Sequence, residues 1–418
     1  MRMNKKKEIV PKLRFPEFIG DKLKITKLGK ISSVVKEKAG ENKYTLMSVT
    51  SGVGLIPQTE KFGREIAGDS YKNYIVIRKY DFAYNKSATK QFPEGYISML
   101  GEYDIAAVPN SIFTCFRITG NESYPPFFDY LWHNNYHGHW LRKYIEVGAR
   151  AHGALSVDTK HLWSMPLALP DFKEQKKIAD CLSSIDELID AESRKLKALE
   201  KYKKGLMQKL FPAEGKTLPE WRFPEFQGCG EWKSKSIGKA CKMFSGGTPD
   251  TSKKEFYGGT IPFIRSAEIN KSSTELFITE EGFKNSSAKM VKKGDILIAL
   301  YGANSGEVAL SKIDGAINQA ILCLRHETNN VFVYHYFTHM KNWIISKYIQ
   351  GGQGNLSGQN IKSVNLYFPK AEEQQKIADF LSEIDTMITG QSNKVEQLKA
   401  HKKGLMQGLF PSFEEADV

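Results

Sequence analysis

The chain has 418 residues, of which 41% are hydrophobic and 26% are charged, as in an ordinary folded protein of two or three domains. Its formal net charge of +13 favours a polyanionic partner such as nucleic acid. No stretch approaches the roughly 18 apolar residues of a membrane span, and the basic amino terminus lacks the apolar core of a signal peptide. The five cysteines contain no C-x-x-C pair, so we expect a cytoplasmic protein with neither disulfides nor a zinc site.

Two segments of the chain each occur in two copies. The motif RFPEF stands at Arg14–Phe18 and again at Arg222–Phe226, and a segment with the pattern EQ-x-KIAD…KKGLMQ-x-LFP occupies Glu174–Pro212 and Glu373–Pro411. Each RFPEF opens a unit and each long segment closes one, so the chain is a tandem duplication of roughly 10–212 and 218–411. We divide it into a first domain (10–168), a first repeated helix (169–212), a linker carrying the second RFPEF (213–231), a second domain (232–368) and a second repeated helix (369–411).

The repeated long segments have apolar residues at alternating spacings of four and three, which predicts helices with a coiled-coil seam. At about 1.5 Å per residue each helix would be about 55 Å long, and each stops at a Leu-Phe-Pro because proline ends a helix. Polar residues interrupt both seams at matching positions, Glu192/Gln391 and Lys203/Lys402, and could fix the register of a two-helix pair. Length and duplication favour an antiparallel intramolecular coiled coil with pseudo-twofold symmetry over two helices that each pack only on their own domain. The seam residues are Ile178, Leu182, Ile185, Ile189, Leu196, Leu199, Ile377, Leu381, Ile384, Ile388, Val395 and Leu398.

The two inserts between the repeated segments differ in sequence, yet a faint common plan survives. Short apolar runs bounded by turns, Tyr74–Arg78 and Asp295–Leu300, predict strands in a mixed α/β (α+β) fold. RKYDFAYNKS resembles KKGDILIALYGANS around Asp81 and Asp295, AVPNSIF resembles AINQAIL, and HGALS resembles QGNLS just ahead of each long helix. We therefore expect one fold that carries two different surfaces.

The repeated segments and several insert motifs together resemble a known family. RFPEF, the duplicated helices, and the insert motifs SGGTP, YGGTIPFIRSAEI, GDILIA and NQAI make the chain similar, over nearly its whole length, to the specificity (S) subunits of type I restriction–modification systems, HsdS. The duplicated helices together with RFPEF carry most of this resemblance, because they are far more specific than any single short motif.

The resemblance implies a non-catalytic subunit of a DNA modification and restriction complex. Its inserts would be target recognition domains, and its repeated helices would space them on an asymmetric, bipartite site in double-stranded DNA. The implied partners are two methyltransferase subunits, which modify adenine N6, and two restriction subunits, with no membrane. S-adenosylmethionine, Mg²⁺ and ATP would be bound by those partners, and no cofactor by this chain.

DNA sequence is read by side chains that reach base edges: arginine to guanine, asparagine or glutamine to adenine, and serine or threonine to either. We select the loop-like segments that are richest in such groups, together with glycines that allow close approach of the backbone and lysines suited to phosphates. The selected residues are Tyr84, Asn85, Lys86, Ser87, Lys90, Asn110, Arg150 and His152 in the first insert, and Ser245, Gly246, Gly247, Thr248, Arg265, Ser266, Tyr301, Asn304, Ser305, Gln353, Asn355 and Ser357 in the second.

Catalytic motifs are poorly matched, so we predict no catalytic residues in this chain. An adenine methyltransferase needs an Asn/Asp-Pro-Pro-aromatic loop, but Tyr124-Pro125-Pro126-Phe127 has tyrosine in place of the acceptor. Asp171 with Glu174 imitates a nuclease motif at too short a spacing, and we expect these carboxylates to complement a helix dipole instead. No Walker loop is present. The histidines of WHNNYHGHW lack a matching carboxylate or cysteine, so packing is favoured over metal.

An alternative of another class is a stand-alone DNA-binding regulator or scaffold built on a coiled coil. Neither insert shows a helix-turn-helix pattern, and such a regulator would have no evident need for two different inserts.

Overall fold

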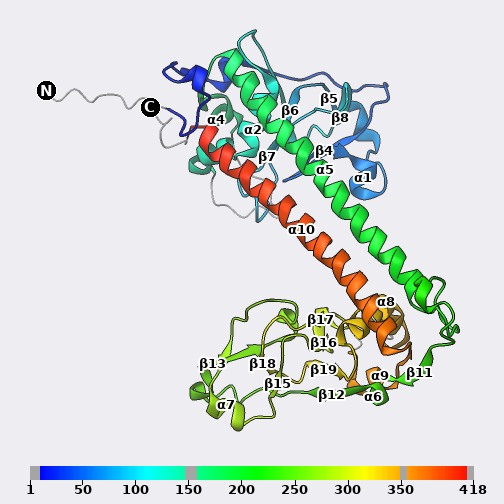
Figure 1. The fold of residues 1–418 in the computed structure, drawn as a ribbon. Coiled ribbons are helices and arrows are strands. Elements are labelled where there is room, and N and C mark those ends of the chain that lie inside the picture. Colours follow the sequence, from blue (N-terminus) through cyan, green and yellow to red (C-terminus); the bar gives the residue numbers. More distant parts are fainter. Residues whose placement is uncertain (1–9, 146–157, 349–354, 412–418) are drawn as a thin grey trace. The chain divides into compact units, whose positions relative to one another are not determined.

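The computed structural model describes residues 10–145, 158–348 and 355–411 (Figure 1). They form two compact units, of which unit 1 combines the residues up to Glu192 with those from Lys394 onward, and unit 2 spans Ser193–Asn393. Each unit therefore contains one RFPEF motif, one insert and one half of each long helix. The boundary between the units cuts both helices near their middle, because each helix half packs on the insert beside it.

Each unit contains an antiparallel four-stranded sheet with the same arrangement of strands. The order is β2-β9-β6-β7 in unit 1 and β12-β19-β16-β17 in unit 2. The first residue of β6, Asp81, accepts a 2.6 Å hydrogen bond from Nε of Arg117, and Asp295, directly before β16, accepts one of 2.8 Å from Nε of Arg325. These matching contacts confirm the predicted alignment of Asp81 with Asp295. The strands are β2 (Ser32–Val34), β6 (Asp81–Asn85), β7 (Tyr96–Met99), β9 (Phe113–Ile118), β12 (Cys241–Ser245), β16 (Ile296–Ala299), β17 (Val308–Leu310) and β19 (Ile321–His326).

The second set of strands is also equivalent in the two units. In unit 2 it is a sheet of order β14-β13-β18-β15, in which Phe263 pairs with Ala316 in parallel. In unit 1 it is a hairpin, β3–β4, and a pair, β5–β8, which a parallel bridge between Leu46 and Ala107 connects. This register places Ser48 at the position of Arg265. The strands are β3 (Met47–Thr50), β4 (Gly54–Pro57), β5 (Ile75–Arg78), β8 (Ile105–Val108), β13 (Tyr257–Ile264), β14 (Phe277–Ile278), β15 (Lys289–Val291) and β18 (Gly315–Ile317).

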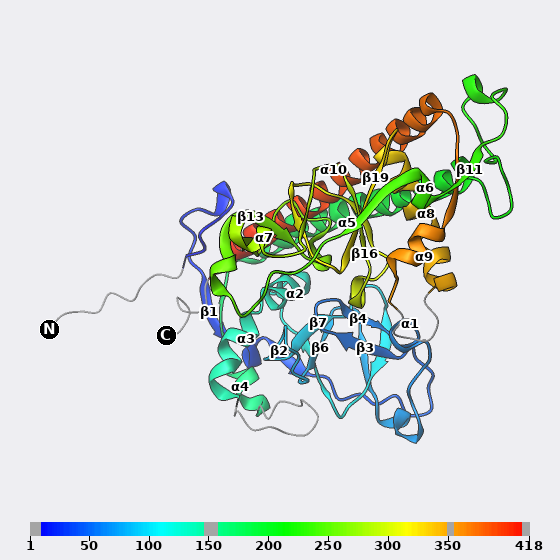
Figure 2. The ribbon, with the colours of Figure 1, turned by 90° about the horizontal axis from the view of Figure 1, so that it is seen from below.

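An antiparallel strand pair closes each insert where the chain enters and leaves it. β1 (Lys24–Lys27) pairs with β10 (Pro166–Leu169), and β11 (Lys233–Ser236) pairs with β20 (Asn365–Phe368). The helices of the inserts are labelled in Figures 1 and 2, and α8 of unit 2 follows β19 just as α2 and α3 of unit 1 follow β9. These helices are α1 (Gln58–Phe62), α2 (Pro125–His133), α3 (Tyr136–Leu141), α4 (Thr159–Trp163), α6 (Ile237–Ala240), α7 (Glu280–Lys284), α8 (Asn330–Tyr348) and α9 (Gly358–Ser363), with short 3₁₀ turns at Leu28–Lys30, Asp69–Asn73, Arg142–Tyr144, Lys254–Phe256, Ser266–Glu268 and Gly302–Asn304.

The two repeated segments form the long helices α5 (Phe172–Leu210) and α10 (Ala371–Leu409). In unit 1 the first turns of α5 share a buried core with the last turns of α10, and in unit 2 the last turns of α5 share one with the first turns of α10. The helices are therefore antiparallel in each unit, as the seam predicts (Figure 1). The same cores include insert aromatics such as Phe128 and Phe332, so each helix half packs both on its partner and on its insert. Among the described residues no helix has the length and apolar character needed to cross a membrane.

A buried ion pair explains why RFPEF and the long helix are duplicated together. Nε and Nη2 of Arg14 donate to Glu174 in the first turn of α5 at 2.8 and 2.6 Å. Arg222 makes the same two bonds to Glu373 in α10, at the same distances. The motif itself continues as a 3₁₀ turn in both copies, Pro16–Phe18 and Pro224–Phe226. Each RFPEF therefore fixes the start of its own long helix, and in α5 the carboxylate of Asp171 also caps the backbone N–H of Glu174.

Candidate nucleic-acid interface

In unit 2 the loops selected from the sequence converge at one edge of the sheets. The backbone N–H of Gly246 donates to the carbonyl of Asn318 at 3.2 Å, and the hydroxyl of Thr248 donates to Oε1 of Gln319 at 2.8 Å. The backbone N–H of Leu300 donates to the carbonyl of Ala320 at 2.8 Å, and the carbonyl of Leu300 accepts from the N–H of Leu356 at 3.0 Å. We call this surface the unit-2 loop edge; it consists of residues 245–248, 265–266, 300–306, 318–320 and 355–357.

The two glycines of SGGT are required by packing inside the protein. A Cβ on Gly246 would lie 1.7 Å from the carbonyl oxygen of Ile317, and one on Gly247 would lie 1.9 Å from Oγ of Ser287. Their presence therefore has a structural cause whether or not DNA approaches them. Contact of Gly246, Gly247 and the neighbouring Ser245 with DNA stays a prediction.

Several polar side chains of the unit-2 loop edge hold its loops in place. The hydroxyl of Ser305 donates to the carbonyl of Leu300 at 2.9 Å, and Ser357 caps α9 by accepting from the N–H of Asn360 at 3.0 Å. Tyr301 and Asn355 are exposed, and Asn304 and Ser266 are half-buried, so these four side chains have access to solvent. Gln353 lies outside the described residues.

Arg265 follows β13 and is the arginine of this edge. Its Nε donates to Oε2 of Glu268 at 2.9 Å, and its Nη2 donates to Oε2 of Glu275 at 2.6 Å. Burial of Glu268 opposes ionisation, but hydrogen bonds from Arg265 and from the Glu275 N–H outweigh it and lower the pKa of Glu268 to about 2. The hydrogen bond to Glu268 is in turn the main cause of a raised pKa at Arg265, so both groups are charged at neutral pH.

In unit 1 the equivalent elements surround a hollow of about 640 Å³. Asn85 at the end of β6, which is 9% exposed, borders this hollow together with Ser87 and Lys90 in the loop that follows, and contact of these residues with DNA stays a prediction. The other walls come from β3, α1 and the start of β9. We call this surface the unit-1 hollow; its lining residues are Ser48, Val49, Thr50, Ser51, Lys61, Phe62, Asn85, Ser87, Thr89, Lys90, Gln91, Phe92, Ile112 and Phe113.

Lys61 in the unit-1 hollow is a cation that the sequence analysis missed. Its Nζ lies 3.2 Å from Oγ of Ser48 and 3.4 Å from the carbonyl of Val49, and burial lowers its pKa. Among the residues that the structure describes, no carboxylate forms an ion pair with Lys61 or with Lys90. Only the packing of α1 against the β3–β4 hairpin brings Lys61 beside Asn85, and no local sequence pattern indicates this contact.

Burial removes one predicted residue from the interface. Tyr84 is 1% exposed, and its hydroxyl donates to the carbonyl of Glu94 at 2.8 Å. The prediction that this side chain reaches DNA is therefore wrong in this structure, because β6 is covered on both faces. Lys86 is half-buried and Asn110 is exposed in the turn before Ile112, while Arg150 and His152 lie outside the described residues.

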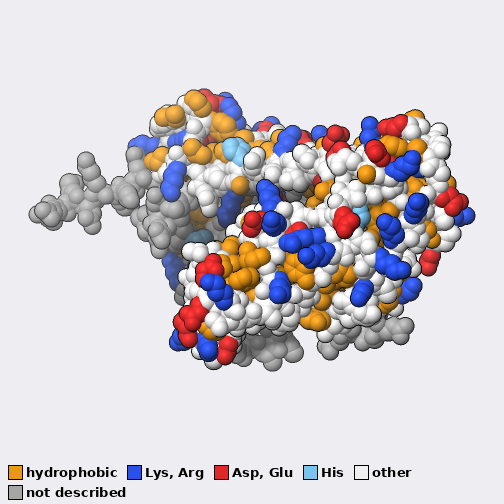
Figure 3. Space-filling view, turned by 60° about the horizontal axis from the view of Figure 1, so that its bottom comes forward, with side chains coloured by type: hydrophobic (Ala, Val, Ile, Leu, Met, Phe, Trp, Pro, Cys, Tyr) orange, Lys and Arg blue, Asp and Glu red, His pale blue; other side chains and the backbone are white. Residues whose placement is uncertain are grey.

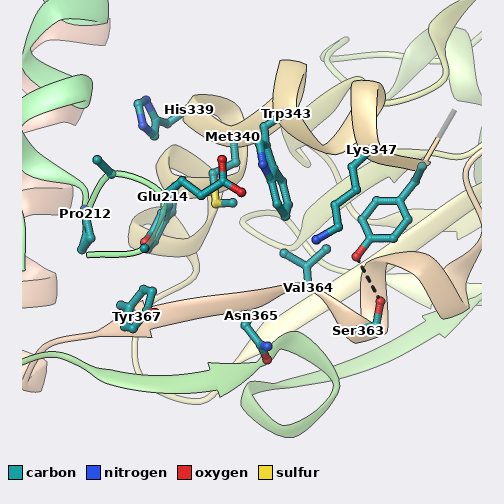
Figure 4. Close-up of a pocket in the computed structure, with 14 residues that line it drawn as sticks. Pro212, Glu214, His339, Met340, Trp343, Lys347, Ser363, Val364, Asn365 and Tyr367 are labelled. Atoms are coloured by element: carbon teal, nitrogen blue, oxygen red, sulfur yellow. Dashed lines mark hydrogen bonds between the residues drawn. The ribbon is translucent and has the colours of Figure 1, made fainter. Parts of the chain in front are cut away.

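A second hollow, of about 340 Å³, lies in unit 2 away from the loop edge (Figure 4). Residues of α8 and β20 and the segment that follows α5 surround it, and Nζ of Lys347 stands 4.4 Å from the ring centroid of Trp343. None of the residues selected for DNA contact lines this hollow, so we do not include it in the interface. In the described part of the chain no group of three or more His, Cys, Asp and Glu side chains could hold a metal ion.

On the face that Figure 3 shows, Lys and Arg side chains are intermixed with Asp, Glu and apolar groups.

The two inserts and their helices correspond to a known family. The profile of the family described as "Type I restriction modification DNA specificity domain" matches residues 70–201 and 230–400, one range in each copy and together well over half of the chain. The chain belongs to this family. The duplicated frame, the paired helices and the two equivalent inserts are thus those of a type I specificity protein.

Curated relatives support this assignment. The chain is 29% identical over 275 residues to the putative type I restriction enzyme MjaX specificity subunit of Methanocaldococcus jannaschii, covering 63% of each chain. It is 30% identical over 169 residues to the EcoR124I/EcoR124II specificity subunit of Escherichia coli, covering 38% of this chain and 42% of that one. The chain therefore spans less than two thirds of the length of these relatives.

Solved structures show the same fold. The type I restriction–modification S subunit from M. genitalium matches with a TM-score of 0.61 at 14% identity, covering 97% of this chain and all of that one. A chain from a study of complex assembly and conformational transition of the type I R-M system matches with a TM-score of 0.57 at 16% identity, covering 93% and 98%. The predicted fold class, two α/β domains joined by long helices, is confirmed.

Proposed function

We propose that this chain recognises an asymmetric, two-part sequence in double-stranded DNA and directs methyltransferase and restriction subunits to it. One observation carries the proposal: two units share a topology and a repeated frame but present different side chains at the same place. Unit 1 offers Asn85, Lys61 and Lys90 around a hollow, whereas unit 2 offers Arg265, Thr248 and Tyr301 on its loop edge. Amide, arginine and hydroxyl side chains prefer different base edges, so the two halves of the DNA site would differ in sequence.

The repeated frame suits a partner that binds twice. Arg14–Glu174 and Arg222–Glu373 are the same contact in two places, so the surfaces around them offer two equivalent docking sites. We propose that two methyltransferase subunits bind there, that each takes its target adenine out of the DNA stack, and that two restriction subunits join the complex. S-adenosylmethionine, Mg²⁺ and ATP would act on those subunits, and this chain would contribute recognition and spacing.

The test is a map of N6-methyladenine in DNA from cells that express this chain with its cognate methyltransferase. The proposal predicts one methylated motif made of two short, unlike halves around a fixed gap of unread base pairs. The matched controls are the methyltransferase alone and the pair with a stop codon in this chain, neither of which should modify that motif. A soluble, assembled complex that leaves DNA unmodified would contradict the proposal and favour a stand-alone regulator or scaffold.

A further inference from the structure

Arg265 occupies a position where only one of the two units can present a long cation. β13 and β18 are parallel and pair Ile264 with Ile317, so Arg265 stands beside Asn318 where both strands end. The carbonyl of Asn318 accepts from Gly246, which places Arg265 within the unit-2 loop edge. At the equivalent position unit 1 has Ser48, which is buried and accepts a hydrogen bond from Lys61.

Glu268 holds the Arg265 side chain in one orientation. The Glu268 side chain is 2% exposed and accepts from Nε of Arg265 at 2.9 Å and from Nη2 at 3.3 Å. The backbone N–H groups of Glu275, at 3.0 Å, and of Arg265, at 3.3 Å, donate to the same carboxylate. A carboxylate bound from four sides cannot rotate freely, so it fixes the plane of the guanidinium that it binds.

The outer edge of this guanidinium remains available. In the described part of the chain nothing accepts a hydrogen bond from Nη1 of Arg265. The second Nη2 proton is donated to Glu275, whose side chain is 73% exposed and whose ion pair is therefore a weak, solvent-screened one. A stronger acceptor pair could replace Glu275 without disturbing Glu268.

We infer that Arg265 reads a guanine in the half-site recognised by unit 2. Glu268 is its positioning residue, and the hydrogen bond from Arg265 to Glu275 is replaced by one to the base when DNA binds. The Nη1–Nη2 edge presents two parallel N–H donors, and guanine presents two acceptors, O6 and N7, in the major groove. No other base offers that pair of acceptors. This inference rests on the proposed function and adds a base, a residue and an orientation to it.

The experiment uses the full chain assembled with its cognate methyltransferase and DNA duplexes that carry the mapped motif. Each guanine of the motif is replaced in turn by 7-deazaguanine, which lacks N7, and by hypoxanthine, which keeps N7 and O6. For wild-type protein we expect a loss of binding of about tenfold or more at one guanine with 7-deazaguanine and little loss with hypoxanthine, because a good bidentate base contact is worth about 1–3 kcal/mol.

The variants distinguish a base contact from its alternatives. Arg265→Ala should bind the wild-type motif about tenfold more weakly and lose its sensitivity to 7-deazaguanine at that one position. Arg265→Lys keeps the charge but not the planar pair of parallel donors, so it should weaken binding of the motif and reduce this sensitivity. Glu268→Gln should reduce discrimination between guanine and adenine there, whereas Glu275→Gln should keep the discrimination and bind no more weakly than wild type.

Recognition of the other half-site is the internal control for folding and assembly, since none of these substitutions touches unit 1. Sensitivity to 7-deazaguanine that persists in Arg265→Ala would overturn the inference, and so would an equal weakening of all duplexes by Arg265→Ala, which would mark a phosphate contact. A wild-type complex that recognises no two-part motif would instead contradict the proposed function itself.

Discussion

Nζ of Lys402 in α10 lies 2.5 Å from Oδ1 of Asp186 in α5 and 2.6 Å from its Oδ2. The duplicate residues make the reciprocal contact in unit 2, where Nζ of Lys203 lies 2.5 Å from Oδ1 of Asp385. The lysines form one of the two pairs of polar residues that interrupt the seam at matching positions. They are thus paired across the helix–helix contact, and an antiparallel pairing of two duplicated helices produces two such contacts from one sequence motif.

The Lys402–Asp186 contact predicts a measurable coupling between the two helices. The pair is partly buried, so we expect a coupling energy of about 1 kcal/mol from the double-mutant cycle of Lys402→Met and Asp186→Asn. Hydrogen exchange in the helix halves of unit 1 is a suitable readout, because a chain with two units does not unfold in a single step. The exposed pair Lys399–Glu396 within α10 is the control. Equal coupling energies for the two pairs would show that the contact between the helices stabilises unit 1 no more than an exposed surface pair does.

Arg222 and Glu373 should be essential to the start of α10. Their side chains are 9% and 2% exposed, so Arg222→Met would leave a buried carboxylate without its partner and destabilise unit 2 by about 3–5 kcal/mol. Arg222→Lys should recover only part of this loss, because lysine cannot make both parallel bonds. Hydrogen exchange in the unit-2 half of α10 measures the effect, and the half-exposed Lys376→Met is the control. Full recovery by lysine would contradict the role of the two-bond geometry.

His335 predicts a loss of stability in acid. It is 1% exposed, neither ring nitrogen has a hydrogen-bond partner in the described chain, and Nδ1 is 3.9 Å from Asp385. Burial, and secondarily the charge of Lys203, lower the pKa of His335 from 6.5 to about 3. The unfolded chain therefore takes up this proton first as the pH falls below 6.5, and folding stability is lost from there down toward pH 3.

Replacing this histidine by phenylalanine should remove that part of the pH dependence. The gain of His335→Phe over wild type should grow by about 2 kcal/mol between pH 8 and pH 5, since one pKa unit corresponds to about 1.4 kcal/mol. The difference at pH 8 reports packing alone and serves as the control. The free energy of opening of unit 2, obtained from hydrogen exchange of its core amides at both pH values, gives the result, and an unchanged difference between them would show that His335 is not the titrating group.

Lys61 should contribute to DNA affinity without selecting a sequence. If it binds a phosphate, Lys61→Met in the assembled complex should weaken binding of all duplexes similarly and reduce the salt slope of log K by about 1. The exposed Lys201→Met in α5 is the matched control for charge. A change of motif without a change of salt slope would show instead that Lys61 reads a base.

The repeated frame could be predicted from the sequence because its patterns involve neighbouring residues and occur in two copies. The 4,3 spacing in α5 and α10, the proline stops and the aligned Asp81 and Asp295 each depend on neighbouring residues, and all were confirmed. In unit 2 the chain leaves β12 after Ser245 and makes a 3₁₀ turn at Gly302–Asn304, as the turn chemistry of SGGT and YGANS indicates, whereas part of QGNLS lies outside the described residues.

The features that could not be predicted from the sequence depend on contacts between segments that are distant along the chain. Tyr84 and Asn85 are neighbours in a strand and both are buried, but the tyrosine packs in the core while the asparagine, at 9% exposure, borders a hollow. Lys61 reaches that hollow only through the packing of α1. The two carboxylates around Arg265 were equally hidden, because Glu275 is brought back to it by the turn before β14.

The most direct test of the account is to give the chain the same recognition insert twice. Residues 24–169 run from β1 to β10 and residues 233–368 from β11 to β20, so the paired end strands provide matched junctions for replacing the second range by the first. Methyladenine mapping with the cognate methyltransferase should then give a motif in which one wild-type half appears twice and the other is absent. A motif that keeps both wild-type halves would contradict the claim that each unit reads its own half-site.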